Sequence, residues 1–386
     1  MYPALYYFFF DVFGIEIEGL KYLPSFGFCV AVSFLLAAYF FGLELKRKES
    51  LGFLSAGKEK VMKGKPASAM DLGSNALIGF LLGFKFIGLF LGAAEGIEMK
   101  EYIFSSKGNP LAGVVLGAFF AYLKFKEKDK EKLVEPKWVD EIVHPYQRVS
   151  ELTMIAAIAG IIGAKVFHQF EYWDQFIQDP IGNLFSDSGL TFYGGLILGA
   201  GSVMYYARKK GMNILVVADA CSPALILAYA IGRIGCQVSG DGDWGVVNTA
   251  PKPGWMGFLP DWMWAYNFPH NVNGVGVDLI NCTGWEPYCT ALPQAVYPTA
   301  FYETVMGLMI FGFLWTVRKR IKVTGVMFCL YLFLNGAERF TIEKMRVNST
   351  FEFLGMQITQ AQLISSILMI IGASGIAYFY NKAKKI

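Results

Sequence analysis

The chain is poor in the residues that most often carry polar chemistry. It has only 3 histidines and 6 cysteines among 386 residues, and only 17% of its residues are charged. His144, His168 and His270 stand far apart and form no triad with a serine, so each is expected to be a satisfied polar residue. No Cys-x-x-Cys pair and no His/Cys spacing typical of a metal site is present. The sequence therefore predicts no metal and no organic cofactor.

A basic surface for nucleic acid is also missing. The formal net charge is only +3, and no basic patch carries interleaved aromatic residues for stacking. The N-terminal segment has Asp11, Glu16 and Glu18 where a secretory signal would have a basic stretch. We therefore expect no nucleic-acid partner and no cleavable signal peptide.

Hydrophobic residues, in contrast, are abundant. They make up 54% of the chain, and the mean hydropathy is +0.41. Soluble domains are about 45–50% apolar, and a membrane-spanning helix needs about 20 predominantly apolar residues. Nine stretches are candidates, of which the third is short: 24–44, 73–94, 109–124, 150–170, 189–207, 213–232, 297–317, 323–340 and 358–380. The sequence therefore predicts an all-α polytopic membrane protein with about nine transmembrane helices in a single membrane domain, residues 1–386.

The distribution of charge orients these helices. Lysine and arginine gather in alternate connections: 45–70, 124–148, 208–210, 318–322 and 382–385. Acidic or mixed segments, 95–101 and 171–187, lie between them. By the positive-inside rule the basic side is cytoplasmic, which places the N-terminus outside and the C-terminus inside. This regular alternation of basic and acidic connections also supports the prediction of nine transmembrane helices.

The long loop 241–296 then lies outside. It is rich in Trp, Tyr, Pro and Gly, and aromatic rings favour the headgroup level, so it predicts an ordered cap at the membrane surface. Cys282 and Cys289 in this loop can form a disulfide if it faces an oxidising compartment. Glycines spaced four apart, such as 79/83 and 113/117, are typical of closely packed membrane helices.

The stretch 228–245, AYAIGRIGCQVSGDGDWG, is the strongest candidate for a functional site. An apolar run ends on Arg233, and Gly235, Gly240 and Gly242 are expected to break the helix. A fixed charge at the end of a membrane-length segment is costly unless it has a partner or a role. An anionic lipid headgroup fits this arginine; the alternative is an arginine that snorkels to the interface beside an ordinary turn.

Three other motifs place polar residues at the predicted outer ends of helices. They are Tyr193-Gly194-Gly195, Tyr302 with Glu303, and the trio Arg339, Glu343 and Arg346. The trio has the spacing i, i+4, i+7, which puts all three side chains on one face of a continuing helix, so that Glu343 can pair with either arginine. A purely structural ladder of ion pairs is the alternative. Two arginines from separate helices are able to clamp a phosphate through forked hydrogen bonds.

Together these motifs resemble the bacterial prolipoprotein diacylglyceryl transferase family. The segment GRIGCQVSGDGDWG is similar to the family signature GRxGNxxNGExxG, and FYGGL, YPTAFYE and RFTIEKMR follow the order of its other motifs. Phe26-Gly27 resembles the aromatic-Gly pair that opens its first helix, and Asp219 falls where the family has an aspartate. From its distance to Arg233, Asp219 is expected to be a helix-terminus or packing residue. The likeness covers about 24–44 and 150–380, so that 45–148, with two predicted spans, looks like an insertion into a seven-helix core.

The resemblance implies a reaction and a location. The family moves the diacylglyceryl group of phosphatidylglycerol to the thiol of the lipobox cysteine in a prolipoprotein signal peptide. The reaction forms a thioether, releases glycerol phosphate and is the first step of lipoprotein maturation. The resemblance thus implies a multi-pass transferase in the lipid bilayer of the bacterial cytoplasmic (inner) membrane, with its active site toward the outer face.

The resemblance also implies roles for individual residues. Arg233 and Arg339 would hold the lipid phosphate, supported by Glu343 and Arg346, and Asp241 takes the place of the signature glutamate. Further substrate contacts would come from residues of the same motifs: Phe26, Gly194, Gly195, Ser239, Gly240 and Tyr302.

Besides Asp241, four positions depart from the family pattern, and one of them is Tyr297, which stands where histidine is common. Tyr193 stands where the family often has histidine. A tyrosine with a pKa near 10 is a poor base, so it is expected to orient the thiol or the headgroup. Cys236 and Ser239 replace two asparagines of the signature, and a covalent role for Cys236 is not expected without a partner base.

Two other functional classes use the same features. A transporter or lipid-binding membrane protein would bind an anionic solute with these arginines; inverted repeats and broken helices near the midplane would favour it. A structural membrane scaffold would explain the packing glycines but not the arginines.

Overall fold

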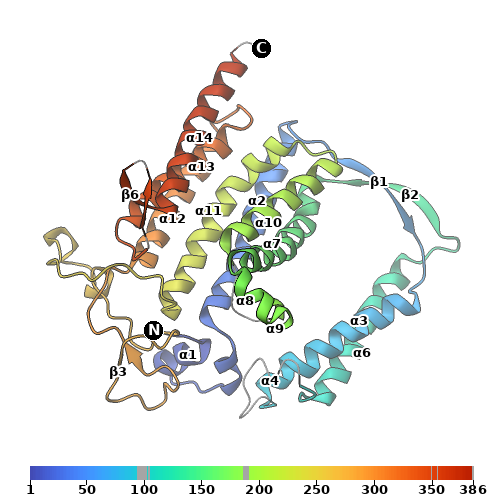
Figure 1. Cartoon of the computed structure of the whole chain (residues 1–386). Helices are drawn as coiled ribbons and strands as arrows, with labels where there is room; N and C mark the ends of the chain where they lie inside the picture. The colour runs from blue at the N-terminus through green and yellow to red at the C-terminus, as the bar shows by residue number, and fades with distance from the viewer. Residues whose placement is uncertain (94–101, 103–104, 186–190, 349, 354, 385–386) are drawn as a thin grey trace. The chain divides into compact units, whose positions relative to one another are not determined.

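A computed structural model describes the chain except for residues 94–101, 103–104, 186–190, 349, 354 and 385–386 (Figure 1). The acidic segment 95–101 and Asp187, which contributed to the predicted orientation, lie outside the described residues. The chain forms two compact units, which we describe separately. The first unit contains Met1–Val30, Lys58–Glu141 and Gly232–Phe301; the second contains Ala31–Gly57, Ile142–Ile231 and Tyr302–Ile386.

A helix forms at each of the nine predicted spans (Figure 1). These helices are α2 (Ser25–Ser50), the continuous α3 (Ala69–Leu81), π-helical turn (Leu82–Ile87) and α4 (Gly88–Phe90), α6 (Pro110–Glu131), α7 (Val149–Glu171), α10 (Phe192–Lys209), α11 (Ile214–Ser239), α12 (Thr299–Val317), α13 (Val326–Glu343) and α14 (Gln360–Ala383). Among the described residues, six helical stretches are long and apolar enough to cross a membrane by length and composition: Ser25–Ser50, Ala69–Phe90, Pro145–Glu171, Ile214–Ser239, Thr299–Val317 and Gln360–Ala383. The other three, α6, α10 and α13, carry charged residues toward one end, which lowers their mean hydropathy.

The expectation of an all-α chain is too narrow, because three short β-ribbons are present. β1 (Gly57–Lys63) pairs with β2 (Lys137–Val143), β3 (Val277–Asp278) with β4 (Thr290–Ala291), and β5 (Thr350–Phe353) with β6 (Met356–Thr359). Short helices complete the fold: α1 (Leu5–Phe13), α8 (Trp173–Gln178) and α9 (Pro180–Phe185). The ribbons lie in connections between helices, where a two-stranded pair leaves no apolar periodicity for sequence analysis to detect. The protein is therefore mostly helical.

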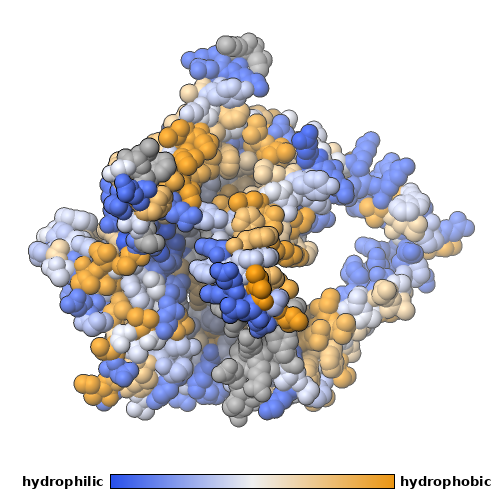
Figure 2. Space-filling model, viewed as in Figure 1, coloured by the Kyte–Doolittle hydropathy of each residue, from blue (hydrophilic) through white to orange (hydrophobic). Residues whose placement is uncertain are grey.

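Glycines allow the closest contacts between helices, as their spacing predicts. In the first unit, a Cβ on Gly79 would lie 2.5 Å from the Leu116 carbonyl oxygen, and one on Gly83 would lie 2.2 Å from that of Ala112, so α3 packs directly on α6. Apolar side chains of this pair are exposed, including Leu77 at 58%. Figure 2 shows hydrophobic residues at the surface of the protein. Small residues inside and apolar residues outside are typical of helices that contact lipid.

Two buried groups fix the helices of the second unit. Leu45 and Leu152 are fully or almost fully buried in a core shared by α2, α7, α10 and α11. Asp219 accepts hydrogen bonds from the backbone N–H groups of Gly325 (2.7 Å) and Phe328 (2.9 Å). It therefore satisfies free donors at the start of α13, which confirms its expected role as a helix-terminus residue.

The loop 241–296, in the first unit, has its own internal contacts. The predicted disulfide between Cys282 and Cys289 is confirmed. Trp285 stacks on Tyr7 of α1 (ring centroids 5.1 Å apart) and on His270 (4.1 Å). The disulfide thus closes a turn within the loop, and aromatic packing holds the loop against the N-terminal segment. Its position outside the membrane stays a prediction.

Candidate functional site

The first group of candidate residues lies near the end of α11. The helix continues past Arg233 to Ser239, so the prediction that it ends at Arg233 and is broken at Gly235 is wrong. Gly235 instead permits a close approach of α2, because a Cβ there would lie 3.2 Å from the Cα of Phe26. The helix ends at Gly240, whose φ of +65° favours glycine, as expected. Phe26 therefore lies beside the helix that carries Arg233, and its contact with substrate stays a prediction.

Arg233 forms an ion pair with Asp243. Its Nη1 contacts the Oδ2 of Asp243, and the same nitrogen lies 3.7 Å from the Sγ of Cys236. The Sγ of Cys236 lies within 4.8 Å of a carboxylate oxygen of Asp241, whose Oδ1 accepts the backbone N–H of Asp243 at 3.3 Å. Asp241 thus belongs to the cluster, but Asp243 makes the direct pair. Asp243 was not assigned to the site from the sequence, because spacing alone does not show which of two aspartates only two positions apart reaches Arg233.

Burial controls the protonation of this cluster. The pKa of Asp241 is raised above its ordinary value of 3.8, mainly because burial penalises its charged form. The hydrogen bond from Cys236 and the charge of Arg233 lower this pKa, whereas the charge of Asp243 raises it. Ligand atoms of Cys236, Asp241 and Asp243 lie within 4.8 Å of one another, as a metal ion would require. The Arg233 guanidinium already supplies a positive charge here, so we assign no metal.

The turn after α11 is held by the start of α12. The Thr299 hydroxyl donates to the Asp243 carbonyl oxygen at 2.6 Å, and the Gly245 N–H donates to the carbonyl oxygen of Tyr297 at 2.8 Å. Ser239 is buried, and its carbonyl oxygen accepts the N–H of Val272 at 3.1 Å. Residues 297–299 (YPT) therefore hold the turn formed by residues 240–245 (GDGDWG).

The second group of candidate residues lies in the second unit, where one carboxylate joins two arginines. Glu303 on α12 is fully buried, and its Oε1 lies 3.0 Å from Arg339 Nη1 and 3.5 Å from Arg346 Nη1. Arg339 Nη2 also lies 3.3 Å from the Oε2 of Glu343, which accepts a hydrogen bond from Asn348 at 2.6 Å. Arg339 keeps 27% of its side chain exposed, so it can reach a ligand while both carboxylates hold it.

The trio does not share one continuous helix. α13 ends at Glu343, so the prediction that the helix continues to Arg346 is wrong. Arg346 still joins the group, because the turn after the helix brings it to Glu303. Glu303 belongs to a motif that the sequence analysis named, but it was not assigned to the site. A carboxylate within an apolar segment is costly, and this cost could have indicated a functional role for Glu303. Glu338, also buried, accepts a hydrogen bond from Tyr229 at 3.1 Å and was missed altogether.

Tyr193 lies at the start of α10, close enough to Arg339 and Glu343 to feel their charges. Gly194 next to it packs on α7: a Cβ there would lie 2.4 Å from the Gly163 carbonyl oxygen, and one on Gly195 would lie 3.0 Å from that of Gly160. Helix packing thus accounts for both glycines, and their contact with substrate stays a prediction. Tyr302 is half-buried beside Glu303 on α12.

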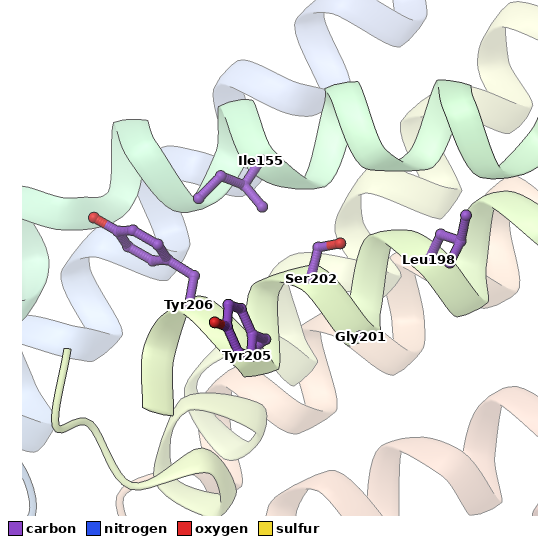
Figure 3. A pocket seen from close by; sticks show the side chains of 6 residues that line it. All are labelled: Ile155, Leu198, Gly201, Ser202, Tyr205 and Tyr206. Carbon is purple, nitrogen blue, oxygen red and sulfur yellow. The ribbon is translucent and has the colours of Figure 1, made fainter. Parts of the chain in front are cut away.

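A pocket of about 340 Å³ lies between α7 and α10 (Figure 3). Its lining residues are Ile155, Leu198, Gly201, Ser202, Tyr205 and Tyr206. The lining is mainly apolar, and it includes none of the predicted site residues. We assign no reaction to this pocket, because it lacks a charged group to hold a phosphate.

The Arg233 and Arg339 groups belong to different units, so each is described by itself. Both combine an arginine with carboxylates that hold its guanidinium in place. Such an arrangement is suited to binding a phosphate, because a guanidinium presents several donors in a fixed plane. That both groups act on one phosphate stays a prediction.

Sequence comparison matches residues 110–378 to the family described as prolipoprotein diacylglyceryl transferase. Several relatives carry the name phosphatidylglycerol–prolipoprotein diacylglyceryl transferase. One from Dehalococcoides mccartyi is 29% identical over 244 residues, which cover 62% of this chain and 80% of the relative. One from Leptospira interrogans is 26% identical over 301 residues, covering 66% and 82%. One from Symbiobacterium thermophilum is 30% identical over 239 residues, covering 61% and 78%.

The matched range begins at residue 110, inside the segment 45–148, and leaves out 24–44. The boundaries of the insertion therefore stay a prediction.

Proposed function

The chain belongs to the prolipoprotein diacylglyceryl transferase family, and we propose how its two arginine groups carry out the family's reaction. It is a multi-pass membrane enzyme that transfers the diacylglyceryl group of phosphatidylglycerol to a prolipoprotein cysteine. The observation that carries the assignment of residues is the pairing of each arginine with fixed carboxylates at the family's motifs.

The reaction requires a good leaving group and a reactive thiol. The lipobox sulfur attacks a glyceryl carbon, a carbon–sulfur bond forms, and the bond from that carbon to the phosphate oxygen breaks. Glycerol phosphate leaves with the electron pair of that bond, and the thiol proton passes to a base. A free thiol has a pKa of about 8.5, so only a few per cent of it is thiolate at neutral pH.

Arg233 and Arg339 support the departing phosphate. Cations that are already oriented stabilise charge developing in the transition state without reorganisation. Asp243 holds Arg233, and Glu303 and Glu343 hold Arg339, so each guanidinium needs little rearrangement on binding. Arg346 strengthens the second group through Glu303.

Asp241 is the group best suited to accept the thiol proton. Its burial raises the pKa of its carboxyl, which brings a carboxylate closer to the range of an effective base at neutral pH. Tyr193 lies near Arg339 and Glu343 and serves to orient the headgroup or the thiol.

The site faces the outer side of the bacterial cytoplasmic membrane in this proposal. Nine spans with the N-terminus outside place the Arg233 turn and the loop 241–296 on that side. The Cys282–Cys289 disulfide in the same loop supports this orientation, since disulfides persist in oxidising compartments. The second substrate is then the signal peptide of a prolipoprotein that presents its lipobox cysteine at the outer face.

The proposal is tested with purified protein, a lipobox peptide and phosphatidylglycerol labelled separately in the acyl chains and the headgroup. We expect acyl label on the peptide as a thioether and an equal amount of labelled glycerol phosphate. Peptide with its cysteine changed to serine serves as the control. Binding or movement of the lipid across vesicles without thioether would instead indicate the transporter or lipid-binding alternative.

A further inference from the structure

Four groups at the end of α11 form a closed ring of polar contacts. Arg233 Nη1 contacts the Asp243 carboxylate on one side and lies 3.7 Å from the Sγ of Cys236 on the other. The Sγ of Cys236 and a carboxylate oxygen of Asp241 lie within 4.8 Å of each other, and the Oδ1 of Asp241 accepts the backbone N–H of Asp243 at 3.3 Å. The ring thus passes from the cation through sulfur to the Asp241 carboxylate, and then through the backbone N–H of Asp243 and the carboxylate of that residue back to the cation.

Cys236 lies between the Arg233 guanidinium, which donates, and the Asp241 carboxylate, which accepts, so its place suits a side chain that offers both an acceptor and a donor. A thiol can accept a hydrogen bond with its sulfur and donate one with its proton. Because α11 is still helical here, Cys236 lies three residues after Arg233, on the same helix face. The residue is only 7% exposed, so water competes little for these contacts.

A covalent role does not fit these contacts. Transfer of the diacylglyceryl group to Cys236 would form a thioether within the enzyme. A second thiol would then have to displace a thiolate from an unactivated carbon, which lacks the leaving group that phosphate provides. A cysteine that acts by hydrogen bonding avoids this difficulty.

We propose that Cys236 is a positioning residue for the transfer reaction: its sulfur accepts from Arg233 while its thiol donates to Asp241, which keeps the phosphate-binding guanidinium and the base at a fixed separation. This inference rests on the proposed function and goes beyond it, because it gives the thiol that replaces the signature asparagine a defined task. An asparagine side chain also offers a donor and an acceptor, so either residue can close the ring.

The first test compares Cys236→Ala, Cys236→Ser and Cys236→Asn. Alanine removes both contacts to charged groups, so we expect kcat/KM for phosphatidylglycerol to fall roughly tenfold to a hundredfold. Serine and asparagine keep a donor and an acceptor and should restore most of the activity. Cys221→Ala is the matched control, because it changes a cysteine of the same helix about four turns from the ring.

The pH profile separates positioning from a merely structural effect. The hydrogen bond from Cys236 lowers the pKa of Asp241, along with the backbone N–H of Asp243 and the charge of Arg233, while the charge of Asp243 opposes them. Loss of the thiol should therefore move the acid limb of the kcat/KM profile to higher pH in Cys236→Ala. Cys236→Ser should restore the original position of this limb. If Cys236→Ala has unchanged activity and an unchanged pH profile, the proposal is overturned. It is also overturned if Cys236→Ser and Cys236→Asn fold but lose as much activity as Cys236→Ala.

A second test is independent of catalysis. The infrared S–H stretching band of Cys236 is identified by its disappearance in Cys236→Ala. We expect this band to lie at lower frequency than that of the control thiol Cys221, and to shift upward in Asp241→Asn. An unshifted band overturns the ring even when transfer is observed. If the unchanged protein transfers no lipid, the proposed function fails, and this band still decides whether the ring exists.

Discussion

The buried carboxylate of Glu303 lies 3.0 Å from the guanidinium of Arg339, although the two residues are 36 positions apart in sequence. This contact joins α12 to α13 within the second unit and fixes the direction of the arginine. Because Glu303 has no exposed surface, its charge has to be compensated by the cations beside it. We therefore expect the contact to contribute to stability and, in the proposed function, to the orientation of Arg339.

Replacing Glu303 by glutamine keeps its size but removes the charge that holds Arg339. We expect the free energy of unfolding to fall by about 3 kcal/mol, the usual cost of removing one partner of a buried pair. We also expect kcat/KM for transfer to fall at least roughly tenfold, because the arginine is no longer fixed. Unfolding in detergent and the transfer assay measure the two effects.

Glu135→Gln provides the control for this substitution, because Glu135 is exposed in a connecting segment. It should change neither quantity. A Glu303→Gln variant as stable and active as the unchanged protein would show that the buried ion pair is not needed.

Gly194→Ala should weaken the packing of α10 on α7. The added methyl group would lie 2.4 Å from both the Gly163 carbonyl oxygen and the Cβ of Phe167, so the helices have to separate. We expect a loss of about 1–3 kcal/mol in stability, typical of overpacking. Transfer should also fall, because Tyr193 moves relative to Arg339.

Gly201→Ala on the same helix is the matched control. No atom lies within 4 Å of a Cβ built there, so alanine should be neutral or stabilise the protein by up to about 1 kcal/mol. Equal unfolding midpoints for the two alanine variants would contradict the packing account.

Loss of the Cys282–Cys289 disulfide should loosen the loop 241–296. The bond closes a short loop of sequence separation 7, so the chain-entropy relation gives a contribution of about 2.5 kcal/mol. Hydrogen exchange in the double serine variant should therefore show lower protection near β3 and β4. Protection equal to that of the unchanged protein would mean that aromatic packing alone holds this loop.

His270 makes the same loop sensitive to pH. Burial lowers the pKa of His270 below 6.5, as does the nearby N-terminal ammonium, while Asp11 and the hydrogen bond to the Tyr288 carbonyl oxygen raise it. The folded loop therefore prefers the neutral ring. Its stability is complete above pH 6.5 and is lost as the pH falls through 6.5 toward the lower pKa of the folded state.

Hydrogen exchange, corrected for its intrinsic pH dependence, measures this effect. The protection factors of residues 268–291 should fall as the pH is lowered below 6.5. His270→Asn removes the titration, and asparagine tolerates the residue's φ of +59° better than most residues. If the variant keeps the same pH dependence, a group other than His270 is responsible.

The helices could be predicted from sequence because the bilayer restricts the choice of structure. An apolar run of about 20 residues has to satisfy its backbone internally, so each predicted span became a helix. Cys282 and Cys289 could be paired because both lie in one polar loop. The distance between Asp219 and Arg233 along one helix predicted that Asp219 is a helix-terminus residue and not a site residue.

The details of the site depended on contacts that sequence spacing does not encode. Asp241 and Asp243 differ by only two positions, and the turn at Gly240 decides which one reaches Arg233. The end of α13 at Glu343 likewise brings Arg346 to a carboxylate on another helix, Glu303. The short ribbons were missed because such pairs carry no distinctive pattern.

The central claim is that Arg233 and Arg339 hold the same phosphate, and a double-mutant cycle tests it most directly. The assay measures kcat/KM for thioether formation from phosphatidylglycerol by the unchanged protein, by Arg233→Ala and Arg339→Ala, and by the variant carrying both. Arg208→Ala, which removes an exposed arginine at the end of α10, is the control. We predict that each single change lowers kcat/KM by roughly a hundredfold or more and that the combined loss departs from the product of the two. Full activity of either single variant, or strictly independent losses, would contradict the account.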